Sequence, residues 1–163
     1  MPPARLVPLL LLLVSAAVVD ITWGFQLIGG LEPCELCLYQ RWPYYAVMAA
    51  AALALLAGRR GVTMAFLWLS ALVFLAGAGL ALYHVGVEQH WIAGPTACTG
   101  SGGPVAGIEE FRRRLLAQQV VQCDEVQWSL FGVSLAGWNV VASLALALCC
   151  VVALRRPEVR SNR

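Results

Sequence analysis

The sequence predicts an all-α integral membrane protein, a four-helix bundle with a short amphipathic helix in its longest polar segment. The first observation is composition: the 163-residue chain is 60% hydrophobic and 12% charged, has a mean hydropathy of +0.75 and contains no lysine. A soluble domain carries about twice that share of charged residues. The second observation is four apolar stretches near the roughly 20 residues that a membrane-crossing helix needs. They are Leu6 to Ile28, Leu38 to Gly58, Val62 to Val87 and Leu130 to Leu154.

The first stretch has some features of a secretory signal peptide. An arginine precedes its leucine run, and Ser15-Ala16-Ala17 offers small residues for cleavage. The apolar core of a signal peptide is only about 7 to 15 residues long, whereas apolar character here continues past Asp20 to Ile28. We therefore expect a retained helix. An acid such as Asp20 is costly inside an apolar helix, and we expect Thr22, Gln26 or a neighbouring helix to satisfy it.

The connections determine how the helices pack. Gly29 to Pro33 and Arg59 to Gly61 are too short to hold a domain. Consecutive helices must then form antiparallel hairpins, and residues 1–163 form a single membrane domain. Glycine and alanine in the runs Ala76 to Gly79 and Ala49 to Ala52 permit close approach between helix backbones.

The arginines predict the orientation in the membrane. Seven lie at the N-terminus, in the second connection and at the C-terminus: Arg5, Arg59, Arg60, Arg155, Arg156, Arg160 and Arg163. Four lie on the other side: Arg41, Arg112, Arg113 and Arg114. The positive-inside rule places both termini in the cytoplasm. In a bacterium, a multi-pass protein of this orientation is expected in the inner membrane. The other side is then the periplasm, where disulfide bonds form and persist.

The second outer (periplasmic) loop, residues 88–129, is the segment that can hold structure outside the bundle. Gly107 to Gln119 carries apolar residues at helical spacing with charged residues between them, which is typical of an amphipathic helix. We expect this helix to lie on the membrane surface, and packing against the outer end of the bundle is the alternative. His84 and His90 flank the start of this loop and are expected to be incidental.

Cys34 and Cys37 form a Cys-x-x-Cys motif at the mouth of the second apolar stretch. Pro33 suits the first helical position, where a missing N–H costs nothing. Both cysteines would then lie in the first turn, where the helix dipole favours the thiolate that attacks disulfides. On a continuous helix the two cysteines share a face with Arg41, although Pro43 predicts a kink just after it. Arg41 is either an interfacial anchor or a functional cation drawn toward the hydrocarbon.

Cys98 and Cys123 form a second pair, in the long polar loop. A bond between them would constrain the unfolded chain by about 3 kcal/mol, so a purely structural disulfide is one interpretation. We favour the other, in which this pair exchanges electrons with the Cys-x-x-Cys motif. Cys149 and Cys150, in the fourth stretch, are expected to act as small apolar residues without a redox role.

These features together resemble the DsbB (disulfide-bond formation protein B) family. The resemblance rests on Pro33-Cys34-x-x-Cys37-x-x-x-Arg41 after one membrane helix, with a cysteine pair in the second outer loop, and it covers nearly the whole chain. Supporting stretches are Ala81 to Glu88, Gly94 to Cys98, Cys123 to Trp128 and Phe131-Gly132.

The resemblance implies a quinone-dependent thiol oxidase that reoxidises a periplasmic DsbA-like protein of the thioredoxin fold. Its electrons would pass to the membrane quinone pool, as ubiquinone or menaquinone. Carried over by position, Cys98 accepts the partner's thiolate and releases Cys123. Cys123 then attacks Cys34, which leaves Cys37 facing the quinone. Arg41 would stabilise the Cys37 thiolate or the reduced quinone, and neither a metal nor a nucleic acid is expected.

Other functions fit parts of the pattern. A vitamin K epoxide reductase-like protein also combines a four-helix bundle with a quinone-side dithiol, but late in the chain, whereas Cys34 and Cys37 follow the first helix. A zinc-binding membrane protein would use the same two cysteines and the loop pair as four thiolate ligands, which an oxidising compartment disfavours. A structural membrane protein with inert disulfides is the third alternative.

Overall fold

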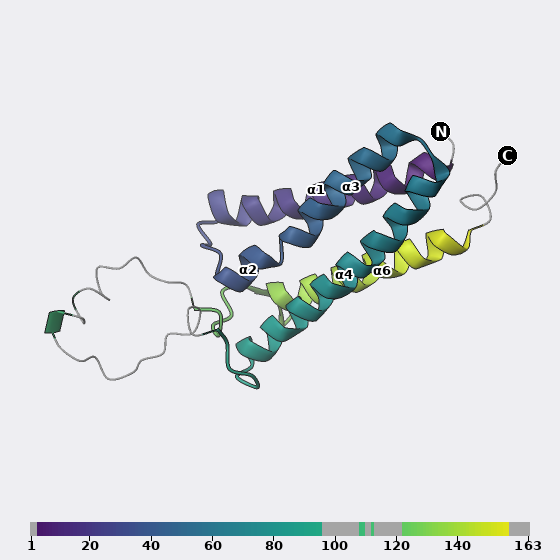
Figure 1. The fold of residues 1–163 in the computed structure, drawn as a ribbon. Coiled ribbons are helices and arrows are strands. Elements are labelled where there is room, and N and C mark those ends of the chain that lie inside the picture. The colour runs from purple at the N-terminus through teal and green to yellow at the C-terminus, as the bar shows by residue number, and fades with distance from the viewer. Residues whose placement is uncertain (1–2, 96–107, 110–111, 113–121, 157–163) are drawn as a thin grey trace.

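The computed structural model describes residues 3–95, 108–109, 112 and 122–156 (Figure 1). Within them, four longer helices form an elongated bundle: α1 (Pro3–Leu27), α3 (Trp42–Ala57), α4 (Arg60–Glu88) and α6 (Leu135–Arg155). A short helix α2 (Glu35–Tyr39) precedes α3, and a hairpin of β1 (Ser129–Leu130) and β2 (Val133–Ser134) precedes α6. The start of α1 and the end of α6 lie at one end of the bundle, and α2 lies at the other (Figure 1).

The prediction of an all-α membrane protein is confirmed at that level. Three helices, α1, α4 and α6, are long and apolar enough to cross a membrane. α3 has 16 residues, which span about 24 Å at 1.5 Å per residue and fall short of a hydrocarbon core of about 30 Å. Many large apolar side chains point outward, such as Leu56 at 84% and Leu82 at 60% exposure, as expected of a surface that contacts lipid.

The second apolar stretch is not the continuous helix predicted from Leu38 to Gly58, because it is interrupted at Gln40 and Arg41. Pro43 supplies the physical reason. Its nitrogen has no hydrogen to donate to the carbonyl four residues earlier, so it is accommodated in the first turn of a new helix. The kink predicted after Arg41 is therefore a full break. It turns both interrupting residues inward, with 7% of Gln40 and 8% of Arg41 exposed.

The last helix begins at Leu135 and not at Leu130 as predicted. The intervening residues form the hairpin, whose two-residue turn consists of Phe131 and Gly132. Both turn residues have positive φ angles, 53° and 78°, as in the type I′ turn that matches the twist of paired strands. Ser134 then caps α6, because its hydroxyl accepts a hydrogen bond of 3.1 Å from a backbone N–H in the first turn.

The helices pack mainly in two pairs, α1 along α3 and α4 along α6, and α3 also contacts α4. Tyr44, Leu67 and Phe74 are among the large side chains that are fully buried in the core. Gly77 of α4 faces the start of α3, where a Cβ atom would lie 3.1 Å from Cγ of Pro43. The close approach predicted for the glycine and alanine run of α4 is thus confirmed at this residue.

Asp20 does not form the hydrogen bonds that the sequence suggested. Its side chain is exposed on the surface of α1. Thr22 Oγ1 instead donates to the backbone carbonyl of Val19 at 2.8 Å, and Gln26 Oε1 accepts from Arg41. The two side chains of α1 that were expected to bond to Asp20 therefore bond to other groups.

The second outer loop is described only near its ends and at residues 108–109 and 112. The amphipathic helix predicted over Gly107 to Gln119 and the cysteine at position 98 lie outside the described residues, apart from Ile108, Glu109 and Arg112, which are exposed. Both remain predictions.

Candidate functional site

The Cys-x-x-Cys motif forms the N-terminus of α2. Cys34 is the N-cap residue, and its Sγ accepts a hydrogen bond of 3.2 Å from the N–H of Cys37. Pro33 therefore precedes the cap and does not occupy the first helical position that was predicted for it. The cap brings the two sulfur atoms within 2.7 Å of each other, approaching the ~2.05 Å of a disulfide bond. The pair is thus placed for reversible formation of a disulfide.

The two thiols differ in acidity because one donates a hydrogen bond to the other. The S–H of Cys34 donates to Cys37 Sγ, which lowers the pKa of Cys37 below the usual value of a thiol although burial opposes the shift. The same hydrogen bond, together with burial, raises the pKa of Cys34. In the reduced pair, Cys37 is therefore the more acidic of the two thiols.

Cys123 packs against this motif from the end of the second outer loop. It is fully buried in a small cluster with Cys34, Leu36 and Val87, and Cys37 packs against that cluster. The structure thus brings together three of the four cysteines predicted to react. The fourth, at position 98, is not among the described residues.

Arg41 does not lie on a helical face shared with the two cysteines, because α2 ends before it. Its guanidinium donates to Gln26 Oε1 at 3.0 Å and to the Thr22 carbonyl at 3.4 Å, and it lies 5.2 Å from the centre of the Trp23 ring. All three of these contacts come from α1 and involve uncharged groups. Arg41 is thus a buried cation held between helices rather than a side chain that extends to the interface.

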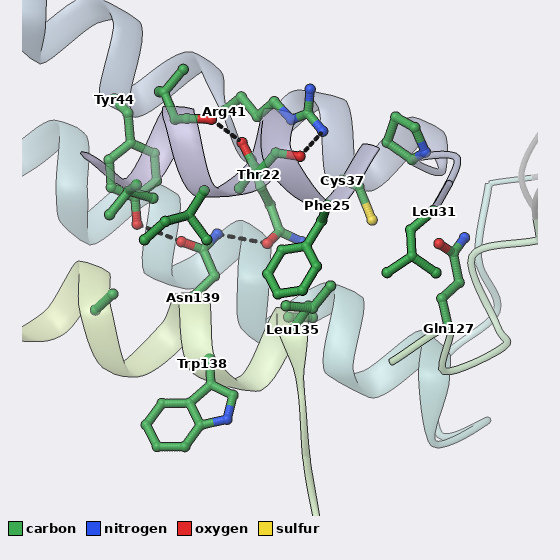
Figure 2. A pocket seen from close by; sticks show the side chains of 17 residues that line it. Thr22, Phe25, Leu31, Cys37, Arg41, Tyr44, Gln127, Leu135, Trp138 and Asn139 are labelled. Atoms are coloured by element: carbon green, nitrogen blue, oxygen red, sulfur yellow. Dashed lines mark hydrogen bonds between the residues drawn. The ribbon is translucent and has the colours of Figure 1, made fainter. Parts of the chain in front are cut away.

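Arg41 and Cys37 meet instead at a cavity of about 230 Å³ (Figure 2). The cavity lies between α1, the α2–α3 break and the start of α6, and its apolar walls include Val18, Ile21, Phe25, Leu135 and Ala136. Gln127 also lines it, and the Nε2 atom of this side chain is buried without a hydrogen-bond partner among the described residues. An apolar cavity with a few converging polar groups is the usual form of a small-molecule site.

A chain of buried hydrogen bonds connects the same cavity to the dithiol. Tyr44 O–H donates to Asn139 Oδ1 at 2.5 Å, and Asn139 Nδ2 donates to Gln40 Oε1 at 2.6 Å. Gln40 Nε2 lies 2.6 Å from His84 Nδ1, and His84 Nε2 lies 3.6 Å from Cys34 Sγ. His84 was expected to be incidental, yet it contacts the motif. Its place near the end of a long apolar helix was the available signal.

The cysteines and His84 also resemble a metal site in part. The ligand atoms of Cys34, Cys37 and His84 lie within 4.8 Å of one another. Thiolates bound to one tetrahedral zinc ion at about 2.3 Å lie ~3.8 Å apart, whereas the two sulfur atoms are 2.7 Å apart. The spacing of the pair fits a disulfide better than a zinc site.

Comparison with known proteins decides the family. The model of a family described as "Disulfide bond formation protein DsbB" matches residues 4–153. The chain belongs to the DsbB family. Disulfide bond formation protein B of Marinobacter nauticus is 33% identical over 161 residues, which cover 93% of this chain and 92% of that protein. Its namesake in Acinetobacter baylyi is 32% identical, with 91% of each chain covered. Disulfide bond formation protein B 2 of Pseudomonas syringae is 32% identical, with 83% of this chain and 79% of that protein covered.

DsbB family membership confirms the resemblance inferred from the sequence. Together with the three long apolar helices, it makes the chain a membrane protein of disulfide bond formation, with the disulfide oxidoreductase activity that the family implies. Sequence patterns identified the cysteines and Arg41 as candidates. They did not identify Gln40, His84 and Asn139, which the fold of this DsbB family member brings to the same site.

Proposed function

We propose that the chain is a membrane thiol:quinone oxidoreductase that reoxidises a DsbA-like periplasmic protein. The observation that carries the proposal is the position of Cys37. One side of the motif packs against Cys123, and Cys37 itself lines the apolar cavity that also contains Arg41. A dithiol between a second cysteine and an apolar cavity is suited to passing electrons from a soluble partner to a membrane acceptor.

The proposed topology places both termini in the cytoplasm and the cysteine pairs in the periplasm of a bacterial inner membrane. The start of α1 and the end of α6 share one end of the bundle, and the motif lies at the opposite end (Figure 1). We further propose that the fourth crossing begins at Leu38, near the end of α2, and continues through α3, so that Cys34 and Cys37 lie on the periplasmic side. The stretch from Leu38 to Ala57 is longer than α3 alone, which has 16 residues.

The thiol chemistry proceeds by disulfide exchange, in which each attacking thiolate releases another. A thiolate of the partner attacks Cys98 in a Cys98–Cys123 disulfide, and Cys123 leaves as a thiolate. Cys123 then attacks Cys34 of the Cys34–Cys37 disulfide, and Cys37 leaves. The partner's second thiol closes its own disulfide by displacing Cys98. Cys98 then attacks Cys123 in the Cys123–Cys34 disulfide, which restores the Cys98–Cys123 disulfide and releases Cys34 as a thiolate. Two electrons have then moved from the partner to the Cys-x-x-Cys pair.

The cavity beside Cys37 has the chemistry that a quinone needs. Its apolar walls suit the ring and the start of an isoprenoid tail. The Nε2 of Gln127, which has no hydrogen-bond partner within the part of the chain that the structure describes, is a donor from which a quinone carbonyl oxygen can accept. Arg41 places a positive charge where negative charge on a reduced acceptor would be stabilised. A bound ubiquinone or menaquinone would supply the oxidising power, as a two-electron acceptor.

The experiment that tests the proposal is anaerobic mixing of the purified, quinone-loaded protein with a reduced DsbA-like protein. Partner thiols and quinone absorbance are followed together, and one quinone should be reduced for every two thiols lost. Cys37→Ser should abolish quinone reduction. Cys149→Ser, which removes an exposed cysteine of α6, is the matched control and should not. Thiol loss without quinone reduction, or quinone reduction that persists in Cys37→Ser, would contradict the mechanism.

A further inference from the structure

We propose that Gln40 and Asn139 are positioning residues that hold His84 in the tautomer protonated at Nε2. The consequence is an unbroken series of hydrogen-bond donors that ends at the Cys37 sulfur. This inference deepens the proposed function and rests on it only in assigning Cys37 as the sulfur that faces the acceptor. The series runs through α3, α6, the α2–α3 break and α4.

The direction of the series is set at Tyr44. Its oxygen lies 2.5 Å from Asn139 Oδ1, within the range of O–H···O hydrogen bonds and shorter than N–H···O hydrogen bonds usually are. Ser143 Oγ, which lies 3.5 Å from Asn139 Oδ1, also donates to that atom. Asn139 therefore uses its carbonyl as an acceptor on the Tyr44 side. Its NH₂ group faces Gln40 Oε1 at 2.6 Å.

Gln40 transmits this direction to the imidazole. Because its carbonyl oxygen accepts from Asn139, its NH₂ group faces His84 Nδ1 at 2.6 Å. An amide NH₂ can only donate, so Nδ1 must accept, and the proton of a neutral imidazole must lie on Nε2. Cys34 Sγ lies 3.6 Å from this nitrogen and Glu88 Oε1 lies 4.0 Å from it, and the imidazole also has a hydrogen bond with the backbone of Cys123.

The last two members of the series are the cysteines themselves. Cys34 accepts from His84 and donates its S–H to Cys37 at 2.7 Å. Successive donors of the same direction polarise one another, and burial keeps water from replacing them: only 2% of His84 and 7% of Gln40 is exposed. In the opposite tautomer, His84 would accept the Cys34 proton and withdraw the donor from Cys37. The orientation of two amides thus decides which sulfur is stabilised as a thiolate.

The first test is ¹⁵N NMR of the imidazole nitrogens in the reduced protein, without quinone or partner. The chain has two histidines, so His90→Asn leaves His84 as the only signal. Asparagine tolerates the left-handed backbone at position 90, where φ is 60°. We expect a protonated Nε2 and an unprotonated Nδ1. A protonated Nδ1, or a mixture of the two tautomers, would overturn the proposal.

The second test reverses the series with Asn139→Asp. A carboxylate keeps an acceptor for Tyr44 but has no donor for Gln40, which must then turn its NH₂ toward the carboxylate and its carbonyl toward His84. We expect the imidazole proton to move to Nδ1. The alkylation rate of Cys37 at pH 7 should fall roughly tenfold, the low end for losing a hydrogen bond to a charged group.

Asn139→Leu is the companion variant, because it removes both the acceptor and the donor of the amide and so favours neither orientation of Gln40. We expect a mixture of His84 tautomers in this variant, and a smaller fall in the alkylation rate of Cys37 than in Asn139→Asp. An unchanged Nε2-protonated imidazole in both variants would show that the amides do not position His84. Failure of quinone reduction would not change either reading, because the tautomer is measured in the absence of quinone and partner.

Discussion

Removal of the Cys34 S–H is expected to raise the pKa of Cys37 and slow its reaction with electrophiles. The two sulfur atoms lie 2.7 Å apart, and the hydrogen bond that the Cys34 S–H donates is the largest cause of the lowered pKa of Cys37, while burial acts in the opposite direction. Cys34→Ala removes the donor and leaves the burial. A hydrogen bond to a charged group contributes about 1.5 to 3 kcal/mol, or about one to two pKa units. The thiolate fraction of Cys37 at pH 7 should then fall by roughly 10- to 100-fold.

Cys34→Ser is the matched control, because its hydroxyl can donate in place of the thiol. The assay is the rate of iodoacetamide alkylation of Cys37 against pH, read by mass spectrometry under reducing conditions. A lowered pKa keeps the thiolate populated to lower pH, so the midpoint of the rate profile of Cys34→Ser should stay at the pH found for the unsubstituted protein. The midpoint for Cys34→Ala should move to higher pH. Equal midpoints in the two variants would refute the assignment of the donor.

Three further predictions follow from the geometry. Arg41→Ala should lower quinone turnover by roughly 10- to 100-fold, because it removes one charged hydrogen-bond donor, and should leave thiol exchange with the partner intact. Arg155→Ala is the control. Unchanged turnover and unchanged quinone affinity in Arg41→Ala would remove Arg41 from the mechanism. Gly77→Val should lower the Tm, because a Cβ at this position would lie 3.1 Å from the side chain of Pro43, and overpacking of this kind costs about 1 to 3 kcal/mol of the free energy of unfolding. Gly79→Val is the control, since a Cβ there meets nothing within 4 Å. Equal Tm values for the two variants would contradict this packing. Thiol counting on the denatured resting protein should find only the two adjacent cysteines of α6 before reduction and all six cysteines afterwards, whereas four additional thiols with stoichiometric metal would indicate a zinc site.

Local patterns predicted the parts of the fold that depend on local physics. Long apolar stretches predicted α1, α4 and most of α6, because helix length in a membrane follows from the thickness of the hydrocarbon. The Cys-x-x-Cys motif predicted a helix start, and the structure makes Cys34 its cap. The hairpin before α6 was missed because its turn includes Phe131 at a positive φ, which is unfavourable for a bulky residue and has no strong local signal.

The hydrogen-bonded part of the site could not be predicted because it depends on contacts distant in sequence. Gln40 meets His84 across 44 positions and Asn139 across 99 positions. Each residue alone is a common polar interruption of an apolar helix. Only the packing of α4 and α6 around the α2–α3 break shows that their side chains are partners.

The break between α2 and α3 explains how one short segment supports both sides of the dithiol. A continuous helix would have placed Arg41 beneath the two cysteines as a single stabilising charge. Because Pro43 interrupts the helix, consecutive residues that both line the cavity have different hydrogen-bond partners: Gln40 bonds to His84 and Asn139, and Arg41 bonds to α1. The amide that positions His84 is thereby separated from the cation. Substitution of Gln40 should therefore change the reactivity of Cys37 even without quinone, whereas substitution of Arg41 should leave that reactivity unchanged.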